Sequence, residues 1–477
     1  MRKYLLAGTS AFALALTAGA ANADSTPGKF DIKISGDAYF EAGAVAISKD
    51  RTATSAANTA GDFINRFRLQ INPEAVADNG LKYGGVVRIR ANSGSTVGVP
   101  AGAVDGDKAY IYVSGAFGSA QAGVTYGPSD VTYVGHPNDW QMLGAYDQWK
   151  YYAGTGSSGL AATAPPVAPA GHAFADGAGG YQNFAWGQFG NGASGAAASP
   201  ASEGMQLLHS HDIDTKVVYY TPRFFGSSPT TGLQGAVSYA PHVGDGYGGG
   251  VSVNTGVSRG TAGATAITGY DNTGVTGVAG STNQQTTAFR DVFELTANYN
   301  EKFGDWSVKG SLGYEAGKAM GTSIQNGLGW ASDYNDLSAL QVGALVGWRD
   351  FQLGGGFVDA FKSGYVKNKN AVITNYSATD QISWNVGGQY TWGPAVFGVK
   401  YLSQKDSGDL SVAGNRTLQS VTAGTMYTVA PGLRTGLEYT YFAAKSDMSM
   451  TNGVSTALGG SNKQTGSVVL ARGVVSF

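Results

Sequence analysis

Four arginines with two-residue spacing are the side chains of this sequence that could most readily act together. Arg66 and Arg68 lie in one short segment, and Arg88 and Arg90 repeat the spacing in a later one. Side chains two residues apart in a β-strand point to the same face. If the two segments are neighbouring strands, the guanidinium groups form one basic patch that attracts anions or acidic side chains. The alternative is that these arginines form the solvated face of a soluble sheet.

Acidic side chains that could face this patch occur in the stretch 127–211, which lacks the alternation typical of strands. A stretch of that length without secondary structure in a compact protein is usually functional. The earlier acids, Asp130, Asp139 and Asp147, are the better candidates because they lie closest to the segment that precedes the stretch. Carboxylates opposite guanidinium groups would set an electric field across any opening between them.

Residue sets for catalysis or metal binding are weak in this chain. His209, His211 and Asp212 could form part of a metal site, but no further ligand is evident and we favour a solvated loop. The chain has no cysteine, so it contains neither a disulfide nor a thiolate metal site. The many glycines are explained better by turns and close packing than by a phosphate-binding loop. We therefore predict no catalytic residue, no metal, no cofactor and no enzymatic activity.

The elements that must hold the arginines are β-strands, because apolar and polar residues alternate through much of the chain. Arg66 and Arg68, for example, are separated by the apolar Phe67. We predict sixteen strands, an even number that suits a single-chain bacterial barrel. Their approximate ranges are 31–46, 63–72, 80–91, 107–114, 117–126, 212–221, 232–240, 290–300, 305–316, 336–348, 351–360, 379–391, 395–404, 416–428, 433–443 and 465–477.

The connections between the predicted strands alternate in length. Short connections such as 115–116, 349–350 and 393–394 alternate with long ones such as 127–211 and 241–289. Barrels with tight turns at one rim and long loops at the other produce this pattern. A sandwich has no reason to sort its loops in this way, and a solenoid would show a repeat period. We therefore predict a barrel with long extracellular loops.

The two ends of the chain and its composition indicate export to a membrane. Residues 1–23 combine a basic start, a short apolar run and a small-residue cleavage motif, so they are predicted to be a cleaved signal peptide. A net charge of −2 does not suit nucleic-acid binding, and no later apolar run reaches the roughly 18 residues of a membrane helix. The terminal apolar segment ends on Phe477, where a soluble sheet would expose an edge. Residues 24–477 are therefore predicted to form an all-β, 16-stranded antiparallel transmembrane barrel.

The inside of such a barrel would be lined by polar, charged or glycine residues, and sixteen strands enclose a lumen wide enough for water. We therefore expect a conduit whose selectivity depends on its narrowest radius and on the charges that line it. The stretch 127–211 is too long to stand free above the barrel mouth and is predicted to fold into the lumen as a constriction loop. Arg66, Arg68, Arg88 and Arg90 would form the basic side of the opening, facing the acids of that loop.

Four features of the sequence carry a resemblance to a known family. They are YIYVSGAFGSAQAG at 110–123, VYYTPRFFG at 218–226 followed by LQGAVSY at 233–239, the terminal Phe477, and sixteen strands with a long third loop. Together they resemble the trimeric general diffusion porins of Gram-negative outer membranes. The third loop departs from the family because it is longer than is typical and rich in glycine, alanine and proline.

The resemblance implies a homotrimer whose protomers each form a water-filled pore for small hydrophilic solutes and ions. Its surroundings would be the lipid and lipopolysaccharide of the outer membrane. It also implies that the assembly machinery of that membrane reads Phe477, and that an acidic third loop faces the basic wall cluster.

Alternatives stay open on the sequence alone. A substrate-selective porin for sugars would show a line of aromatic residues along the lumen, whereas Tyr39 and Tyr220 point inward without forming an obvious ladder. One selective for anions such as phosphate would have a dominantly basic interior. A barrel-based surface adhesin would use the long loops, and the arginines could instead contact lipopolysaccharide phosphates at the rim.

Overall fold

The computed structural model describes residues 30–47, 61–93, 104–135, 215–242, 289–319, 335–363, 380–406, 416–451 and 454–477. The predicted signal peptide and the third loop beyond residue 135 lie outside these ranges. The secondary structure of the described residues is almost entirely β-strand, apart from a five-residue helix, α2 (Pro128–Thr132). Within the described residues no helix is long and apolar enough to cross a membrane.

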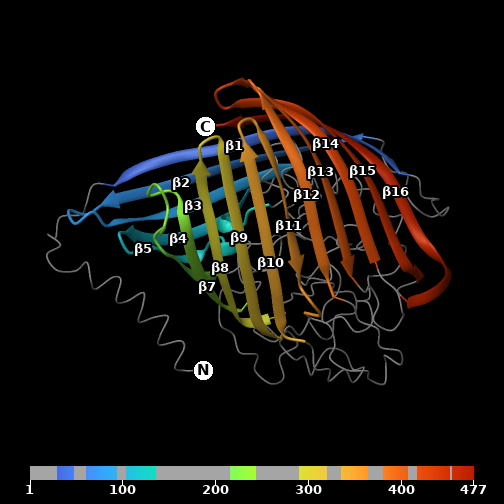
Figure 1. Cartoon of the computed structure of the whole chain (residues 1–477), viewed down its shortest axis with the longest axis horizontal. Coiled ribbons are helices and arrows are strands. Elements are labelled where there is room, and N and C mark those ends of the chain that lie inside the picture. The colour runs from blue at the N-terminus through green and yellow to red at the C-terminus, as the bar shows by residue number, and fades with distance from the viewer. Residues whose placement is uncertain are drawn as a thin grey trace.

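Sixteen antiparallel strands close into a barrel, as predicted (Figure 1). Each strand pairs with its neighbours in the sequence, and β1 pairs with β16 to complete the ring. The strands are β1 (Asp31–Ile47), β2 (Gly61–Val76), β3 (Lys82–Ser93), β4 (Val104–Gly115), β5 (Gly118–Val124), β6 (Thr215–Tyr220), β7 (Gly232–His242), β8 (Phe289–Phe303), β9 (Trp306–Ala319), β10 (Leu337–Trp348), β11 (Phe351–Asp359), β12 (Ile382–Trp392), β13 (Ala395–Asp406), β14 (Arg416–Ala430), β15 (Leu433–Thr451) and β16 (Val454–Ser476).

Two strands are longer than the sequence pattern predicts. β15 and β16 continue through most of the region 444–464, which we predicted to be a long loop. In this extension Met448 lies opposite Ala457, and Thr451 lies opposite Val454. The pairing of an antiparallel ladder depends on backbone groups, so it needs no particular side-chain pattern.

Alternation along each strand separates an apolar outer face from a polar inner face. In β8 the side chains of Phe293 and Leu295 are exposed, whereas those of Glu294 and Thr296 are buried. A barrel in water would place its apolar face inside. Here the apolar face is outside, as contact with lipid requires.

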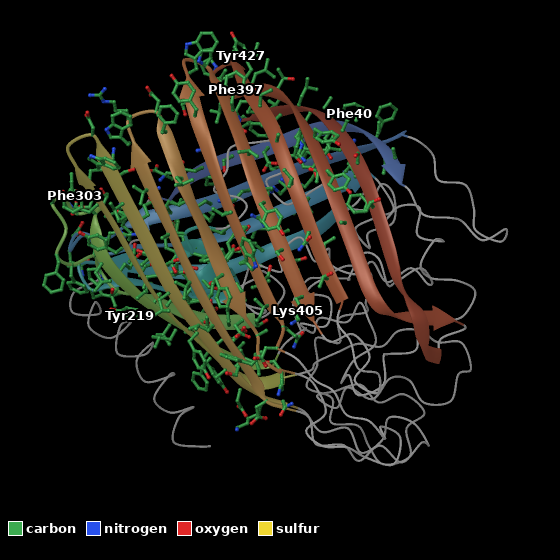
Figure 2. The ribbon with its side chains drawn as sticks, turned by 45° about the vertical axis from the view of Figure 1, so that its right-hand side comes forward. Phe40, Tyr219, Phe303, Phe397, Lys405 and Tyr427 are labelled. Atoms are coloured by element: carbon green, nitrogen blue, oxygen red, sulfur yellow. The ribbon has the colours of Figure 1, made fainter. Side chains whose placement is uncertain are left out.

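Aromatic side chains gather on the outer surface at the rim of the short turns. Figure 2 shows Phe303, Phe397 and Tyr427 at this rim, and all three are exposed. The ring centroids of Trp306 and Trp348, which lie opposite each other in β9 and β10, are 6.1 Å apart. Amphipathic rings at one level of a barrel are typical of the membrane–water interface. The rim of the short turns therefore lies near one surface of the bilayer.

The C-terminal Phe477 takes part in closing the barrel. Its backbone N–H donates to the carbonyl oxygen of Gly36 at 3.0 Å, and the N–H of Gly36 donates to the carbonyl oxygen of Phe477 at 2.8 Å. The ring of Phe477 covers Gly36, where a Cβ would lie 2.7 Å from the ring carbon Cζ. Its centroid is 6.1 Å from that of Phe67 on β2. The terminal residue thus belongs to the seam where the first and last strands meet.

Candidate pore constriction

The chain after β5 turns into the barrel. The backbone N–H of Ser129 in α2 donates to Oε1 of Glu294 at 2.5 Å, and the hydroxyl of Thr132 donates to that of Thr296 at 3.0 Å. Glu294 and Thr296 are inner-face residues of β8, so α2 lies inside the lumen. The first residues of the third loop, up to Gly135, are therefore in the lumen, as predicted.

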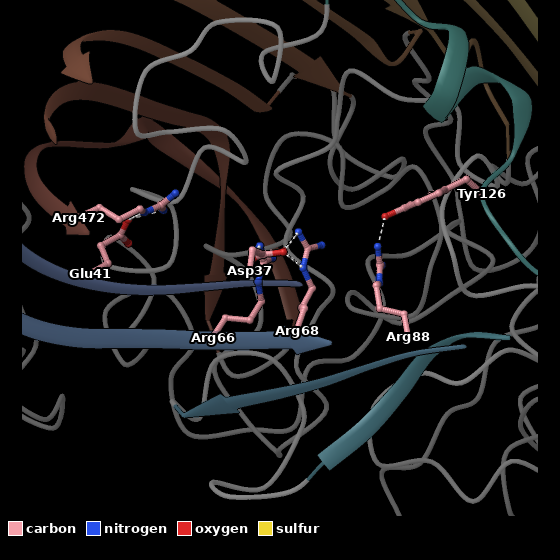
Figure 3. Close-up of polar contacts among 7 residues, drawn as sticks. All are labelled: Asp37, Glu41, Arg66, Arg68, Arg88, Tyr126 and Arg472. Atoms are coloured by element: carbon pink, nitrogen blue, oxygen red, sulfur yellow. Dashed lines mark hydrogen bonds and ion pairs between the residues drawn. The ribbon is translucent and has the colours of Figure 1, made fainter. Parts of the chain in front are cut away.

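The four arginines predicted from their spacing lie on the inner faces of two adjacent strands. Arg68 of β2 lies directly opposite Arg90 of β3, and Arg88 lies one inward position further along β3. Asp37 of β1 accepts hydrogen bonds from two of them: its Oδ2 lies 3.2 Å from Nη2 of Arg66, and its Oδ1 lies 2.7 Å from Nε of Arg68 (Figure 3). These three side chains are each about one-fifth exposed, so they face space inside the barrel.

A fifth arginine extends this wall across the seam of the barrel. Arg472 of β16 lies opposite Glu41 of β1 and donates from Nε to Oε2 at 2.6 Å (Figure 3). The ring of Tyr39 lies between two cations, with its centroid 4.6 Å from Cζ of Arg472 and 4.8 Å from Cζ of Arg66. Such stacking of guanidinium on an aromatic ring is favourable and orders both groups. Sequence reasoning did not single out Arg472, because its proximity depends on the pairing of the two terminal strands.

The root of the third loop is fastened to the same wall. Nη1 of Arg88 donates to the hydroxyl of Tyr126 at 2.8 Å, as Figure 3 shows. Lys108, which lies opposite Arg88 on β4, places Nζ 3.1 Å from the centroid of the Tyr126 ring. Both cations are largely buried. Tyr126 follows β5 directly, so this contact fixes the point at which the loop leaves the wall.

The predicted acidic side is described in part. Asp130 belongs to α2 and therefore lies in the lumen on the side of β8. Asp139 and Asp147 lie outside the described residues. Two further carboxylates of the inner face, Glu294 and its cross-strand neighbour Glu315, are fully buried in this region. Their inward parity marks them as lumen residues, but spacing alone did not single them out.

The charges of the described residues are uneven across this wall. We define the basic wall as Arg66, Arg68, Arg88, Arg90, Lys108 and Arg472. Two carboxylates, Asp37 and Glu41, pair with three of its members. The basic wall thus gathers six cationic side chains on β16, β2, β3 and β4, and charge of one sign along a confined passage favours ions of the opposite sign.

Metal binding has no support in the described part of the chain. No three His, Cys, Asp or Glu side chains come together there as metal ligands would. His209, His211 and Asp212, the set considered from the sequence, lie outside the described residues.

The chain resembles several known proteins. Among solved structures, the chain is similar to the anion-selective porin of Comamonas acidovorans, at 15% identity, with 94% of this chain and 100% of that one covered and a TM-score of 0.47. It is also similar to the trimer form of OmpT, an outer membrane protein of Vibrio cholerae (14% identity, 94% and 99% covered, TM-score 0.45). A mutant porin of Rh. blastica matches at 12% identity, with 94% and 100% covered and a TM-score of 0.44.

No curated protein matches the sequence. The sequence model of the Gram-negative porins, by contrast, matches residues 10–447, which is most of the chain. The closed barrel, with its apolar outer face and polar lumen, is consistent with membership of a family of outer-membrane porins. The chain belongs to the Gram-negative porin family and is a channel of the outer membrane.

Proposed function

We propose that the protein is a general diffusion porin, through which small hydrophilic solutes and ions pass passively. In this proposal the opening has a basic side, formed by Arg66, Arg68, Arg88 and Arg90, and an acidic side on the third loop. Asp130, Asp139 and Asp147 are the proposed acids. No bond is made or broken in this function, so the geometry and charge of the opening determine what passes.

The observation that carries the proposal is the position of the first residues of the third loop. These residues lie against the inner face of β8 and continue toward β12, as the contact between Asn385 and Gly135 indicates. β2 and β3 lie about halfway around the ring from β10 and β11. A loop that starts on one wall and narrows the lumen toward the other would place the opening beside the basic wall.

The direction of selectivity follows from the basic wall. It brings six cationic side chains together on β16, β2, β3 and β4, and Asp37 and Glu41 pair with three of them. Confined charge acts strongly on ions because the low-dielectric wall focuses its field. We therefore propose a preference for anions over cations, reduced by whatever acids the third loop contributes.

A second candidate is a porin that binds one class of anion. It is favoured by the close approach of Arg66 and Arg472 to the ring of Tyr39, which brings two guanidinium groups together although each also pairs with a carboxylate. Such a porin would show small conductance steps that micromolar concentrations of its anion block. A general diffusion porin would show large steps that such concentrations leave unchanged.

The remaining proposals concern export and assembly. Residues 1–23 are proposed to be removed as a signal peptide, and Phe477 is proposed to be read by the outer-membrane assembly machinery. We also propose a homotrimer embedded in outer-membrane lipid and lipopolysaccharide. OmpT of Vibrio cholerae, which shares the barrel fold, is described in a trimer form. Mass spectrometry of the exported protein and chemical cross-linking in native membranes test the first and last of these.

The test of the proposed function is single-channel recording of the refolded mature protein in a planar bilayer with a salt gradient. We expect large ohmic conductance steps that close in three equal parts, and a reversal potential whose sign shows a preference for anions. Absence of conductance would refute the proposal, and small steps blocked by a micromolar anion would favour the second candidate.

A further inference from the structure

A single row of residues crosses the inner wall opposite the basic wall. Ser311 of β9 lies directly opposite Gly343 of β10, Gly343 lies opposite Gly356 of β11, and Gly356 lies opposite Asn385 of β12. The row has a hydrogen-bonding side chain at each end and two glycines between them. We define the loop seat as these four residues together with Leu345, a buried inner-face residue of β10.

The third loop crosses the strands along this row. The N–H of Val134 donates to Oγ of Ser311 at 2.9 Å, and the side chain of Val134 packs against Leu345. At the other end of the row, Nδ2 of Asn385 donates to the carbonyl oxygen of Gly135 at 2.9 Å. Val134 and Gly135 are thus held by hydrogen bonds to the two ends of the row.

The two glycines of the row let this segment lie against the wall. A Cβ on Gly343 would collide with the carbonyl oxygen of Val134 and would lie 2.8 Å from Cε2 of Tyr133. A Cβ on Gly356 would collide with the hydroxyl oxygen of Tyr133 and would lie 2.8 Å from its Cζ. Contacts this short do not occur between real atoms, since carbon atoms rest about 3.5–4.0 Å apart. Any larger residue at either position therefore pushes the segment toward the lumen.

The wall is the stiffer of the two partners in this contact. β10 and β11 are each paired along their length with a neighbouring strand on both sides. Segment 133–135, by contrast, is not part of the strand ladder and contacts this wall through hydrogen bonds with Ser311 and Asn385 and through the packing of Val134. A collision between them is therefore relieved by movement of the loop, by roughly 1–2 Å to restore ordinary contact.

We propose that the loop seat sets the width of the pore. Its members are positioning residues: they touch the loop rather than the solute, and they determine how far the loop stands from the wall. The inference rests on the proposed function, because it assigns a pore width to a conducting channel. The glycines at 343 and 356 would then be required by the width of the opening rather than by the stability of the barrel.

The test compares unit conductances of the full-length refolded protein. Gly343→Ala and Gly356→Ala are expected to lower the unit conductance by roughly one-fifth or more, because conduction depends on the narrowest radius. Gly310→Ala, at an outward-facing position of β9, is the control for adding a methyl group to this part of the wall, since a Cβ there meets only the carbonyl oxygen of Gly343, at an ordinary 3.8 Å. Its conductance is expected to equal that of the unmodified protein.

A second substitution distinguishes displacement of the loop from general damage. Tyr133→Phe removes the nearest atom that a Cβ at Gly356 would strike but keeps Cζ, which would lie 2.8 Å away. The pair Gly356→Ala with Tyr133→Phe is therefore expected to recover part of the conductance that Gly356→Ala loses. The same substitution is expected to leave Gly343→Ala impaired, because the backbone carbonyl of Val134 still collides there.

Each outcome bears on the inference separately from the proposed function. An unmodified protein that does not conduct would refute the porin function itself. If it conducts and both seat glycines tolerate alanine without any change in conductance, the loop seat does not set the pore width. If the glycine variants fail to fold, Ser311→Ala and Asn385→Ala release the same segment without adding an atom. Unchanged conductance and current noise in both of these would overturn the inference.

Discussion

Removal of one partner from the Glu41–Arg472 pair is predicted to destabilise the barrel at its closing seam. The side chain of Glu41 is fully buried, that of Arg472 is 7% exposed, and the two residues belong to the first and last strands. Breaking a buried ion pair by removing one partner costs about 3–5 kcal/mol, since it leaves a buried charge without its partner. Replacing both partners with apolar residues of similar size is often nearly neutral.

The neighbours of the pair place the two single substitutions within that range. Glu41→Leu leaves Arg472 in contact with the ring of Tyr39, and such a contact retains about 0.5–2 kcal/mol. The loss should therefore be near the lower end, about 3 kcal/mol. Arg472→Met leaves a fully buried carboxylate and should cost about 5 kcal/mol. The double variant should lose less than either single one.

The assay is reversible urea unfolding in lipid vesicles, with the free energy of unfolding taken from linear extrapolation. The control is the exposed pair of Arg349 and Asp305 in the short turns, whose Nε–Oδ2 distance is 2.9 Å. Removing that pair should change stability by at most about 1 kcal/mol. Additive losses in the Glu41 and Arg472 cycle, or losses no larger than those of the control, would refute the reasoning.

Three further predictions concern the outer face, the seam and the loop root. Leu295→Arg, which puts a charge on the lipid-facing surface of β8, should lower the free energy of unfolding by about 2–4 kcal/mol in vesicle titrations. Gly36→Ala should slow barrel closure, because a Cβ would collide with the backbone carbonyl oxygen of Arg68 and with the ring of Phe477; the slower appearance of the heat-modifiable folded band on gels measures it, and unchanged kinetics would contradict the expectation. Tyr126→Phe removes the hydrogen bond from Arg88 but no charge, so it should increase current noise while leaving the reversal potential unchanged.

The strands and their inner and outer faces could be predicted because alternation is a local property. Phe67 between Arg66 and Arg68 already implies that the arginines share a face, and the barrel places that face in the lumen. Short and long connections likewise alternate along the chain, so the two rims could be recognised. The predicted loop at 444–464 was wrong, because β15 and β16 extend there by backbone pairing, which does not need alternating side chains.

Contacts between distant segments could not be predicted, because they depend on register and closure. Arg472 belongs to the basic wall only because β16 pairs with β1 in the register that places Arg472 opposite Glu41. The row of Ser311, Gly343, Gly356 and Asn385 exists only when three strand registers are combined. Alternation predicts that each of these residues faces the lumen, but no local pattern predicts that the four lie in one row across the strands.

The most direct test of the central claim is the reversal potential of single channels in a salt gradient. It should be compared before and after Arg66, Arg68, Arg88 and Arg90 are replaced together by glutamine. The unmodified protein is expected to form large ohmic channels with a preference for anions. The variant is expected to retain its conductance, with a reversal potential shifted toward cation preference. An unchanged reversal potential in a variant that still conducts would contradict the central claim, because the basic wall would then not line the opening.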